Sequence, residues 1–316
     1  MNARPIYVET TIAGTIDDIW RRTQVPDQHQ RWDVRFSRIE YLAPAPGQPQ
    51  RFTLATTLAP GVEITGWGET LGERKRPDRT AYSGLQFGSN HPLSLVDEGA
   101  GFWRYVPTSG GVRFLTRFDY RVRGGRVGRL LDRVVFRPLF GWATAWSFDR
   151  LRLWVERRIG PERSRNQALT HAVAVLTLAF VWIYHGLVPK LLAPDTGEIQ
   201  LLRAAGADFG NARLVVALLG LGEIAMGFAT LRWWRNRRPF LATLLAMPVL
   251  TVGALVSDVG TFARPFNPLT LNVGLMALAT VALLSRDDLP SGRRPLRRAP
   301  DSSTVPIPEP TEVLTS

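Results

Sequence analysis

Ionisable side chains close one of the longest apolar runs in this chain of 316 residues. The run begins near Ala168 and ends in VWIYHGLVPKLL, residues 181–192, which carries Tyr184, His185 and Lys190. An ionisable group without a partner costs several kcal/mol in hydrocarbon. These side chains therefore need water, a partner or a functional role.

Their position indicates the outer membrane interface. His185 lies about four residues from the outer end of the segment, roughly 6 Å below it at 1.5 Å per residue. Asn272 has a similar depth in a later apolar segment, and Asp258 lies at the outer end of another. Tyr184 and Lys190 can reach the headgroups by snorkelling. The simpler alternative is that Pro189 ends the helix here and Lys190 anchors it.

Glu223 differs because it lies about ten residues into its apolar segment, near the midplane. A carboxylate at this depth must be protonated, paired or exposed to water. It is either a functional acid or a neutral acid hydrogen-bonded to a neighbouring helix. Straight helices would place it about 9 Å deeper than His185, so one shared site would need a water-filled cavity. The candidate membrane polar site comprises Tyr184, His185, Lys190, Glu223, Asp258 and Asn272.

Four apolar segments are long enough to cross about 30 Å of hydrocarbon. They are residues 168–189, 213–231, 239–257 and 267–285. Arginines concentrate in the flanks before the first segment, after the last, and between the second and third. By the positive-inside rule, these flanks are cytoplasmic. We therefore expect a multi-pass protein of the inner (plasma) membrane, with both the N-terminal domain and the C-terminal tail in the cytoplasm.

Composition narrows the classes of protein to consider. The chain has no cysteine, which excludes disulfides, cysteine-ligated zinc and iron–sulfur clusters. The net charge is +12. The arginines alternate with acidic residues in the first half and lie beside apolar segments in the second, and no nucleic-acid-binding motif is present. The N-terminus lacks an apolar stretch, so no cleaved signal peptide is expected.

The first 160 residues have the pattern of a soluble α+β domain. A strand and two short helices precede six alternating runs separated by turn residues, which predicts an antiparallel sheet. One long helix then covers about 125–159, with a break near Pro138 and Gly141. A curved sheet around such a helix, the helix-grip arrangement, leaves a cavity. The candidate lining residues are Trp67, Tyr82, Trp103, Phe118, Trp142 and Trp146, with Phe114 and Phe140 beside them.

The soluble half shows no evident catalytic site. His29 and His91 form no recognisable triad or metal-binding spacing with nearby acids, so neither catalytic residues nor metal ligands are predicted. Near the start of the long helix, Arg126, Arg129 and Arg133 lie about one turn apart, and Arg137 follows. They form either a solvated basic face or a contact with anionic headgroups.

The N-terminal half resembles the SRPBCC superfamily, which includes START lipid-transfer domains and polyketide cyclase-like proteins. The resemblance covers about 4–158 and rests on the strand–helix–Trp opening, on HQRWD and on the element order. It implies that the cavity binds a hydrophobic small molecule, such as a lipid, isoprenoid or polyketide-like compound, at the inner leaflet. A cyclase or dehydratase acting in the same cavity is the enzymatic alternative.

The second half resembles the DoxX-like family of four-helix bacterial membrane proteins. The resemblance rests on FVWIYHGLVPKLL, on the following loop with EIQLL, and on three further spans. DoxX relatives are described as membrane subunits linked to quinone-dependent oxidation of sulfur compounds. This implies a subunit of a quinone-linked oxidoreductase, with a quinone and a redox partner protein. No haem can be argued from His171 and His185, because they lie near opposite membrane faces, and no cofactor is expected in the chain itself.

These patterns divide the chain into three parts. Residues 1–160 form the ligand-binding domain and residues 161–286 form the four-span domain. Residues 287–316, rich in proline, serine and charge, are expected to be a disordered tail.

Overall fold

The structure is a computed structural model. It describes residues 4–43, 46–75, 80–193, 199, 211–257, 259–263, 265 and 267–300. The chain divides into two compact units. One comprises Met1–Ser164 together with Pro290–Ser316, and the other is Arg165–Leu289. We call them the helix-grip unit and the membrane unit and describe each by itself.

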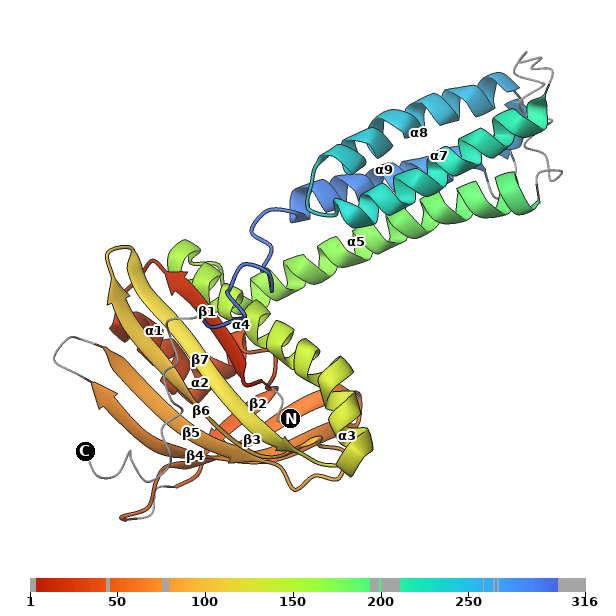
Figure 1. The fold of residues 1–316 in the computed structure, drawn as a ribbon. Helices are drawn as coiled ribbons and strands as arrows, with labels where there is room; N and C mark the ends of the chain where they lie inside the picture. The colour runs from red at the N-terminus through yellow and green to blue at the C-terminus, as the bar shows by residue number, and fades with distance from the viewer. Residues whose placement is uncertain are drawn as a thin grey trace. The chain divides into compact units, whose positions relative to one another are not determined.

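A seven-stranded antiparallel sheet forms the body of the helix-grip unit (Figure 1). The strands are β1 (Ile6–Ile12), β2 (Arg38–Tyr41), β3 (Arg51–Ala59), β4 (Val62–Lys75), β5 (Ala81–Gly88), β6 (Val96–Thr108) and β7 (Gly111–Val122). Their order is β1-β7-β6-β5-β4-β3-β2, so consecutive strands pair from β2 to β7 and β1 closes the far edge against β7. This is the sheet that the alternating runs predict.

Helices cover the inner face of this sheet. They are α1 (Ile16–Gln24), α2 (Pro26–Trp32), α3 (Gly125–Leu131), the π-helical turn η1 (Asp132–Phe136) and α4 (Arg137–Arg157). The core joins the inner positions of β1, β6 and β7 to α4. Phe114 stacks on Phe148 with ring centroids 4.6 Å apart. The predicted helix-grip class is confirmed by this arrangement.

The expected break in the final helix lies in a different place. We predicted a kink near Pro138 and Gly141, but the irregular turn is η1, which ends just before Arg137. The backbone stays helical through Phe136 and Arg137. The missing N–H and the ring of Pro138 therefore affect the carbonyl of Val134, four residues earlier and within η1.

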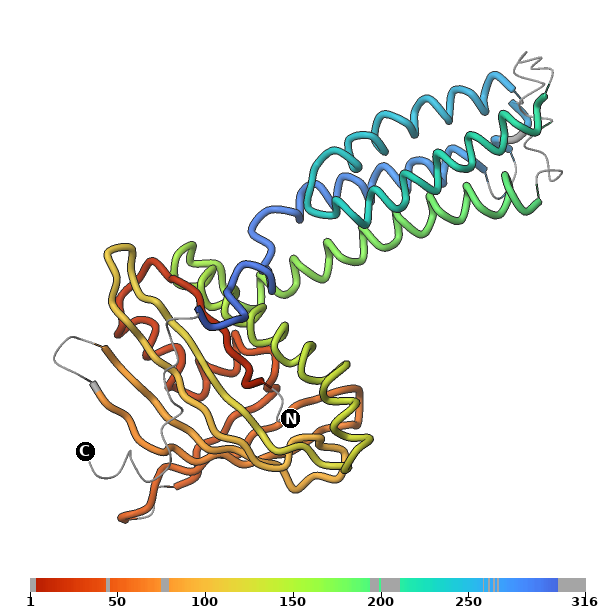
Figure 2. Tube along the Cα trace, viewed as in Figure 1, coloured from red at the N-terminus to blue at the C-terminus, as the bar shows by residue number. Residues whose placement is uncertain are grey.

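The segment after Leu289 is also different from its prediction. Residues 290–300 were assigned to a disordered tail, but they pack on the helix-grip unit. Leu296 exchanges two backbone hydrogen bonds of 2.9 Å with Glu9 of β1. Figure 2 shows the blue end of the described chain running back to the helix-grip unit. The Ser291 amide donates to Asp149 Oδ2 at 2.8 Å. Composition alone missed a segment held mainly by backbone contacts, and residues 301–316 lie outside the described part.

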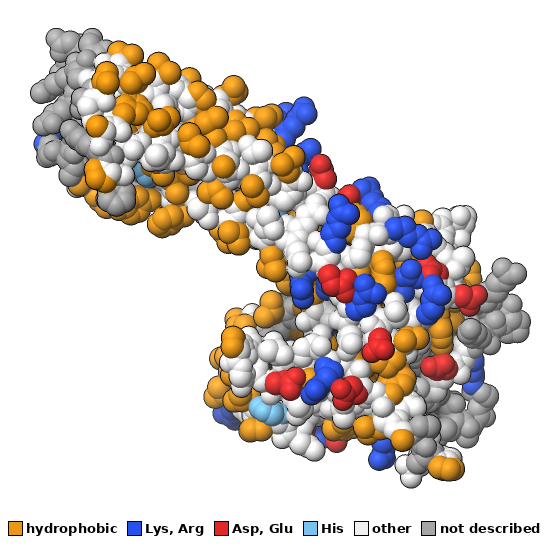
Figure 3. All heavy atoms as spheres, turned by 180° about the vertical axis from the view of Figure 1, so that it is seen from behind, with side chains coloured by type: hydrophobic (Ala, Val, Ile, Leu, Met, Phe, Trp, Pro, Cys, Tyr) orange, Lys and Arg blue, Asp and Glu red, His pale blue; other side chains and the backbone are white. Residues whose placement is uncertain are grey.

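The membrane unit contains the four predicted spans. Its helices are α5 (Pro161–Leu187) continued by the π-helical turn η2 (Val188–Leu192), α7 (Ala212–Arg232), α8 (Arg238–Ser257), the 3-10 turn η4 (Val259–Ala263) and α9 (Pro268–Ser285). Four of these helices are long and apolar enough to cross a membrane. Figure 3 shows hydrophobic side chains over the visible surface of this unit, as expected for contact with lipid.

Hydrogen bonds between side chains and neighbouring helices tie the bundle together. His171 is fully buried and reaches the carbonyl oxygens of Ala282, at 3.0 Å, and Trp234, at 2.7 Å. Trp182 Nε1 donates to Thr243 Oγ1 at 3.2 Å and so links α5 to α8. In hydrocarbon such bonds stabilise a bundle modestly, by about 1 kcal/mol each.

Candidate functional site

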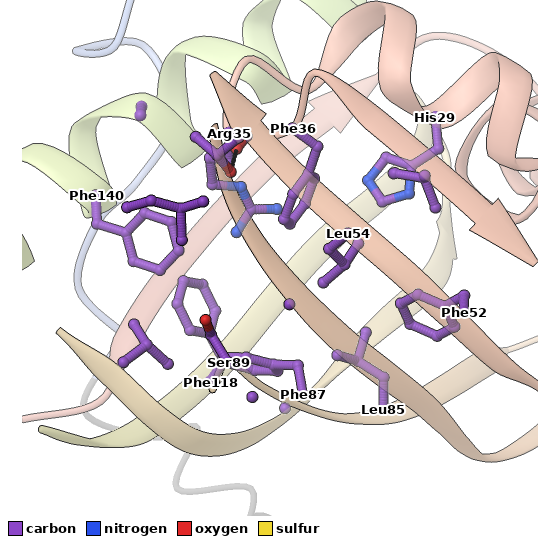
Figure 4. Close-up of a pocket in the computed structure, with 18 of the residues that line it drawn as sticks. His29, Arg35, Phe36, Phe52, Leu54, Leu85, Phe87, Ser89, Phe118 and Phe140 are labelled. Atoms are coloured by element: carbon purple, nitrogen blue, oxygen red, sulfur yellow. Dashed lines mark hydrogen bonds between the residues drawn. The ribbon is translucent and has the colours of Figure 1, made fainter. Parts of the chain in front are cut away.

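The helix-grip unit encloses a cavity of about 600 Å³ between its sheet and its helices. This volume is in the range of small-molecule sites. The inner positions of the sheet supply most of its apolar wall, with Phe52, Leu54, Leu85, Phe87, Trp103 and Phe118, and the last helix adds Phe136, Leu139 and Phe140. Figure 4 shows many of these side chains pointing toward one space.

Two of the four strand residues predicted to line the cavity do so, and two do not. Trp103 and Phe118 lie on its wall. Tyr82 lies on the opposite face of the sheet, where it stacks on Phe102 with centroids 5.3 Å apart. Trp67 pairs with Gly88, over which its indole lies, whereas its neighbours Ile64 and Gly66 line the cavity. The register decides which face each residue takes, and the alternation alone did not settle it.

The two tryptophans of α4 were also predicted to line the cavity, and this was wrong. Trp142 and Trp146 stack on each other, with centroids 6.2 Å apart, on another face of the helix. Gly292 packs against the Trp142 indole, and the Arg150 guanidinium lies over Trp146 at 5.1 Å. They support the returning segment, which sequence analysis had left unstructured.

Three ionisable residues form a connected cluster at one end of the cavity. His29 lies on α2, Asp33 caps its end, and Arg35 follows two residues later. Arg35 Nε and Nη2 donate to the two oxygens of Asp33 at 2.8 and 2.6 Å, which is a bidentate pair. His29 Nε2 lies 3.1 Å from Asp33 Oδ2. We call these three residues the polar cluster.

Local structure fixes the polar cluster in place. Pro26 starts α2, and the fully buried Trp32 anchors its end by donating from Nε1 to the Arg22 carbonyl oxygen at 2.9 Å. The His29 ring stacks on Trp32 with centroids 5.1 Å apart and meets Trp103 edge-on at 4.9 Å. The cluster therefore stands on a rigid aromatic base.

Burial and pairing set the charges of the cluster. Burial lowers the pKa of His29 below its usual value of 6.5, and the opposing effect of Asp33 is smaller. Burial alone would raise the pKa of Asp33, but the Arg35 guanidinium beside it holds that pKa well below its usual range. At neutral pH the cluster thus contains a neutral imidazole, a carboxylate and a guanidinium.

Arg35 faces the cavity among aromatic rings. Its guanidinium carbon lies 5.2 to 5.6 Å from the ring centroids of Phe36, Phe118 and Phe140, distances at which rings attract a cation. In Figure 4 it lies beside Phe36 and Phe140, on a different side of the cavity from Phe52 and Leu85. Its Nη1 has no hydrogen-bond partner among the described residues.

Sequence analysis noted His29 and missed the cluster. The spacing of His29 and Asp33, four residues apart, was a usable signal, because such residues share one helix face. The role of Arg35 depends on the turn after α2 and could not be predicted from spacing. Among the described residues, no group of histidine, aspartate and glutamate could hold a metal ion.

The membrane unit contains a second buried pair. Lys190 Nζ lies 3.1 Å from Glu223 Oε2, and both side chains are mostly buried, at 10% and 14% exposure. Of the three states considered for Glu223, the structure shows the paired one. The depth comparison was made between Glu223 and His185, and it did not predict the contact of Glu223 with Lys190.

Helix ends and glycines explain this pairing. Pro189 does not end the first span, because η2 continues it to Leu192. A Cβ atom at Gly220 would lie only 2.9 Å from Lys190 Cβ, so α5 and α7 approach closely here. α7 begins about two turns before Gly220 and so extends beyond the first helix. Our depth count had placed both helix ends in one plane.

The remaining members of the predicted membrane polar site are dispersed. Asn272 donates to Thr251 Oγ1 at 2.8 Å and links α9 to α8. Tyr184 is exposed and meets the His185 ring at 6.1 Å. Asp258 lies outside the described residues.

Comparisons with known proteins agree with the two-part organisation. The model of the DoxX-like family matches residues 179–280. The uncharacterized membrane protein YndG of Bacillus subtilis (strain 168) is 42% identical over 204 residues, which are 64% of this chain and 76% of YndG. The chain belongs to the family of YndG. It is a membrane protein with a DoxX-like domain, and both Lys190 and Glu223 lie within the matched segment.

Solved structures with similarity to the chain include two with named activities. The Zhui aromatase/cyclase from Streptomyces sp. R1128 is 17% identical, with a TM-score of 0.37, over 50% of this chain and 98% of that protein. A STAR-related lipid transfer protein fragment from Xanthomonas axonopodis is 18% identical, with a TM-score of 0.36, over 47% of this chain and 84% of the fragment.

Proposed function

We propose that the helix-grip unit binds a hydrophobic small molecule, such as a lipid, an isoprenoid or a polyketide-like compound. The cavity carries this proposal. Its volume of about 600 Å³ is suited to a ligand of this size, and its wall is mainly aromatic and aliphatic with one polar cluster. Binding would remove apolar ligand surface from water, at roughly 25 cal/mol per Å².

An exposed face beside the cavity supports exchange of the ligand with lipid. It consists of α3, η1 and the start of α4, with Val127, Leu130, Leu131, Val134, Val135 and Leu139, and we call it the apolar rim. Leu139 is 57% exposed and also lines the cavity, as does Leu93 at 63% exposure. A contiguous exposed apolar face of this kind is a sign of a binding surface.

The charges of the rim favour an anionic lipid surface. Arg126, Arg129 and Arg133 are exposed within it and form no ion pair with any described residue. Arg137, the fourth of the row, instead pairs with Asp132 and Asp119 at 2.9 Å each. Three free arginines among exposed aliphatic residues match anionic headgroups over acyl chains. The rim would then deliver the ligand to the leaflet or collect it there.

The arginine-rich flanks of the spans favour a cytoplasmic helix-grip unit at the inner leaflet of the plasma membrane. This orientation rests on the positive-inside rule. Reporter fusions within residues 195–208 and after Ser285 would test it. A periplasmic signal after Ser285 would overturn it.

A matched pair of variants tests ligand binding. Leu85 lines the cavity, whereas Gln86, the next residue on β5, points to the other face. The full chain, in detergent micelles, would be titrated with a fluorescent lipophilic probe and studied by native mass spectrometry. Leu85→Trp should abolish saturable binding and Gln86→Trp should preserve it. Equal binding by both variants, or no binding by the wild type, would contradict the proposal.

Catalysis in the same cavity is the alternative that the polar cluster keeps open. A cyclase or dehydratase needs a positioned proton donor or acceptor near the ligand, and His29 is within reach of the cavity. Chemical change of the bound molecule during incubation, lost in His29→Phe with binding retained, would favour catalysis over carriage.

A second candidate function belongs to the membrane unit. We propose that the pair of Lys190 and Glu223 takes part in quinone-linked redox chemistry with a partner protein, because ionisable residues within a membrane are functional candidates by default. The double variant Lys190→Met with Glu223→Leu removes both charges together. Unchanged quinone binding and unchanged membrane oxidation of reduced quinone in this variant would reduce the pair to a structural role.

A further inference from the structure

The polar cluster bears on which hydrophobic ligands the cavity accepts. Asp33 is fully buried, and it accepts from Arg35 Nε, Arg35 Nη2, the Arg35 backbone amide and His29. A carboxylate oxygen only accepts, so the neutral His29 ring carries its proton on Nε2 and donates it to Asp33. The N–H groups of His29 and Arg35 that donate to Asp33 are therefore not available to a ligand.

One donor group remains directed at the cavity. The Arg35 fork is bidentate on Asp33, which fixes the guanidinium plane and leaves Nη1 without a partner among the described residues. The Arg35 side chain is only 8% exposed and lines the cavity. A ligand oxygen at Nη1 would therefore accept a charge-assisted hydrogen bond within a mainly apolar space.

Many other polar side chains of the wall form hydrogen bonds within the protein. The hydroxyls of Thr56, Ser89, Ser94 and Thr116 donate to backbone carbonyl oxygens at 2.6 to 3.1 Å. Gln24 donates to Tyr105 and accepts from Ser83. These groups therefore present little unmet hydrogen-bonding demand to a ligand.

The charge of the cavity wall is balanced without a ligand. Among the described residues that line the cavity, Arg35 is the only one with a fixed charge, and Asp33 directly behind it neutralises that charge. An ionised ligand would bring an uncompensated charge into a mainly apolar space, which is costly. A neutral ligand would not.

We propose that the cavity selects hydrophobic molecules whose polar end is an uncharged hydrogen-bond acceptor, such as the carbonyl oxygen of a ketone, ester or quinone, held by Arg35 Nη1. This inference rests on the proposed ligand binding. It excludes free fatty acids in their ionised form as preferred ligands. Arg35 acts as a positioned hydrogen-bond donor, and Asp33 already balances its charge.

The test compares two probes of equal chain length, a long-chain methyl ketone and the corresponding carboxylic acid. Each would displace the lipophilic fluorescent probe from the detergent-solubilised full chain at pH 7.5. We expect the ketone to bind at least about tenfold more tightly than the acid. Arg35→Met should weaken binding of the ketone about tenfold, because it removes the donor to the carbonyl oxygen, and leave binding of a pure alkane unchanged.

Reversing the charge balance sharpens the test. Asp33→Asn keeps the shape of the side chain but leaves Arg35 as an uncompensated cation, so the acid should then bind more tightly than the ketone. The wild-type comparison stands even if this variant fails to fold. Equal or tighter binding of the acid by the wild type would overturn the inference and leave ligand binding intact. Failure of the ketone, the acid and the alkane alike to bind would refute the proposed function itself.

Discussion

Both units contain a buried cation paired with a carboxylate, and the pair of Arg35 with Asp33 differs in chemistry from the pair of Lys190 with Glu223. In the helix-grip unit the planar Arg35 fork meets Asp33 with two parallel hydrogen bonds, at 2.8 and 2.6 Å. In the membrane unit the Lys190 ammonium meets Glu223 as a point charge at 3.1 Å. The guanidinium still has Nη1 to donate to a ligand, whereas the ammonium of Lys190 joins two helices.

The difference also determines how each pair responds when it is broken. Arginine remains charged at any accessible pH, and Arg35 is held among aromatic rings. Glu223 can bind a proton and lose its charge, and the long Lys190 side chain can extend toward the interface. Breaking the pair of Arg35 and Asp33 should therefore destabilise the protein more than breaking the pair of Lys190 and Glu223.

The largest effect is expected from Asp33→Leu. The substitution leaves the Arg35 cation buried and removes the partner of His29, so the free energy of unfolding should fall by about 3–5 kcal/mol. Denaturant titration of the detergent-solubilised chain, followed by tryptophan fluorescence, would measure it. The double variant Asp33→Leu with Arg35→Leu should recover much of the loss. Glu40→Gln, at an exposed position of β2, should cause no measurable change.

Lys190→Met should have a smaller effect. It removes a cation 3.1 Å from the mostly buried Glu223, so the free energy of unfolding should fall by about 1–3 kcal/mol. Thermal unfolding in micelles would measure it. The double variant Lys190→Met with Glu223→Leu should be less destabilised than the single variant, and an equal or larger loss in the double variant would mean that Lys190 acts through packing alone.

The contact that brings this pair together can be tested without touching a charge. A Cβ atom at Gly186 would lie 2.3 Å from the Gly220 carbonyl oxygen, so Gly186→Ala should separate α5 from α7 and cost about 1–3 kcal/mol. Gly222→Ala is the control, because nothing lies within 4 Å of that position. Similar melting temperatures for the two variants would show that the close approach is unimportant.

The smallest effect on folding stability is expected at the apolar rim, where the quantity that changes is lipid binding. Replacing Arg126, Arg129 and Arg133 together by glutamine should weaken attraction to anionic lipid by about 1 kcal/mol per arginine. Hydrogen exchange of residues 125–136 in nanodiscs, with and without anionic lipid, would report it. Protection that rises with anionic lipid in the wild type alone supports docking. Identical exchange in both proteins contradicts it.

The sequence predicted which helices and strands form better than it predicted which side chains contact one another. Four spans, an antiparallel sheet and a final long helix follow from apolar length and alternation, which are local properties. The face taken by Trp67 depends on register and on a bulge between Thr70 and Gly72 of the same strand pair. Trp142 was misassigned because its partner, Gly292, is 150 positions away in the chain.

The two polar sites show the same limit. His29 and Asp33 share a helix face, which spacing can indicate, but Arg35 joins them through a turn whose geometry is not in the pattern. Lys190 and Glu223 were both singled out, yet a depth count from helix ends could not pair them. The position of one helix along another is set by packing, here by the close approach of α5 and α7 at Gly186 and Gly220.

The returning segment after α9 carries a consequence for topology. Residues 4–164 and 290–300 belong to one folded unit, joined by the paired backbones of Leu296 and Glu9. Pieces of one unit cannot lie on opposite sides of a bilayer, so the chain between them must cross an even number of times. Parity thus supports four crossings independently of arginine counts and excludes three. Deleting any single span would send residues 290–300 to the wrong side and leave the edge of β1 without its partner.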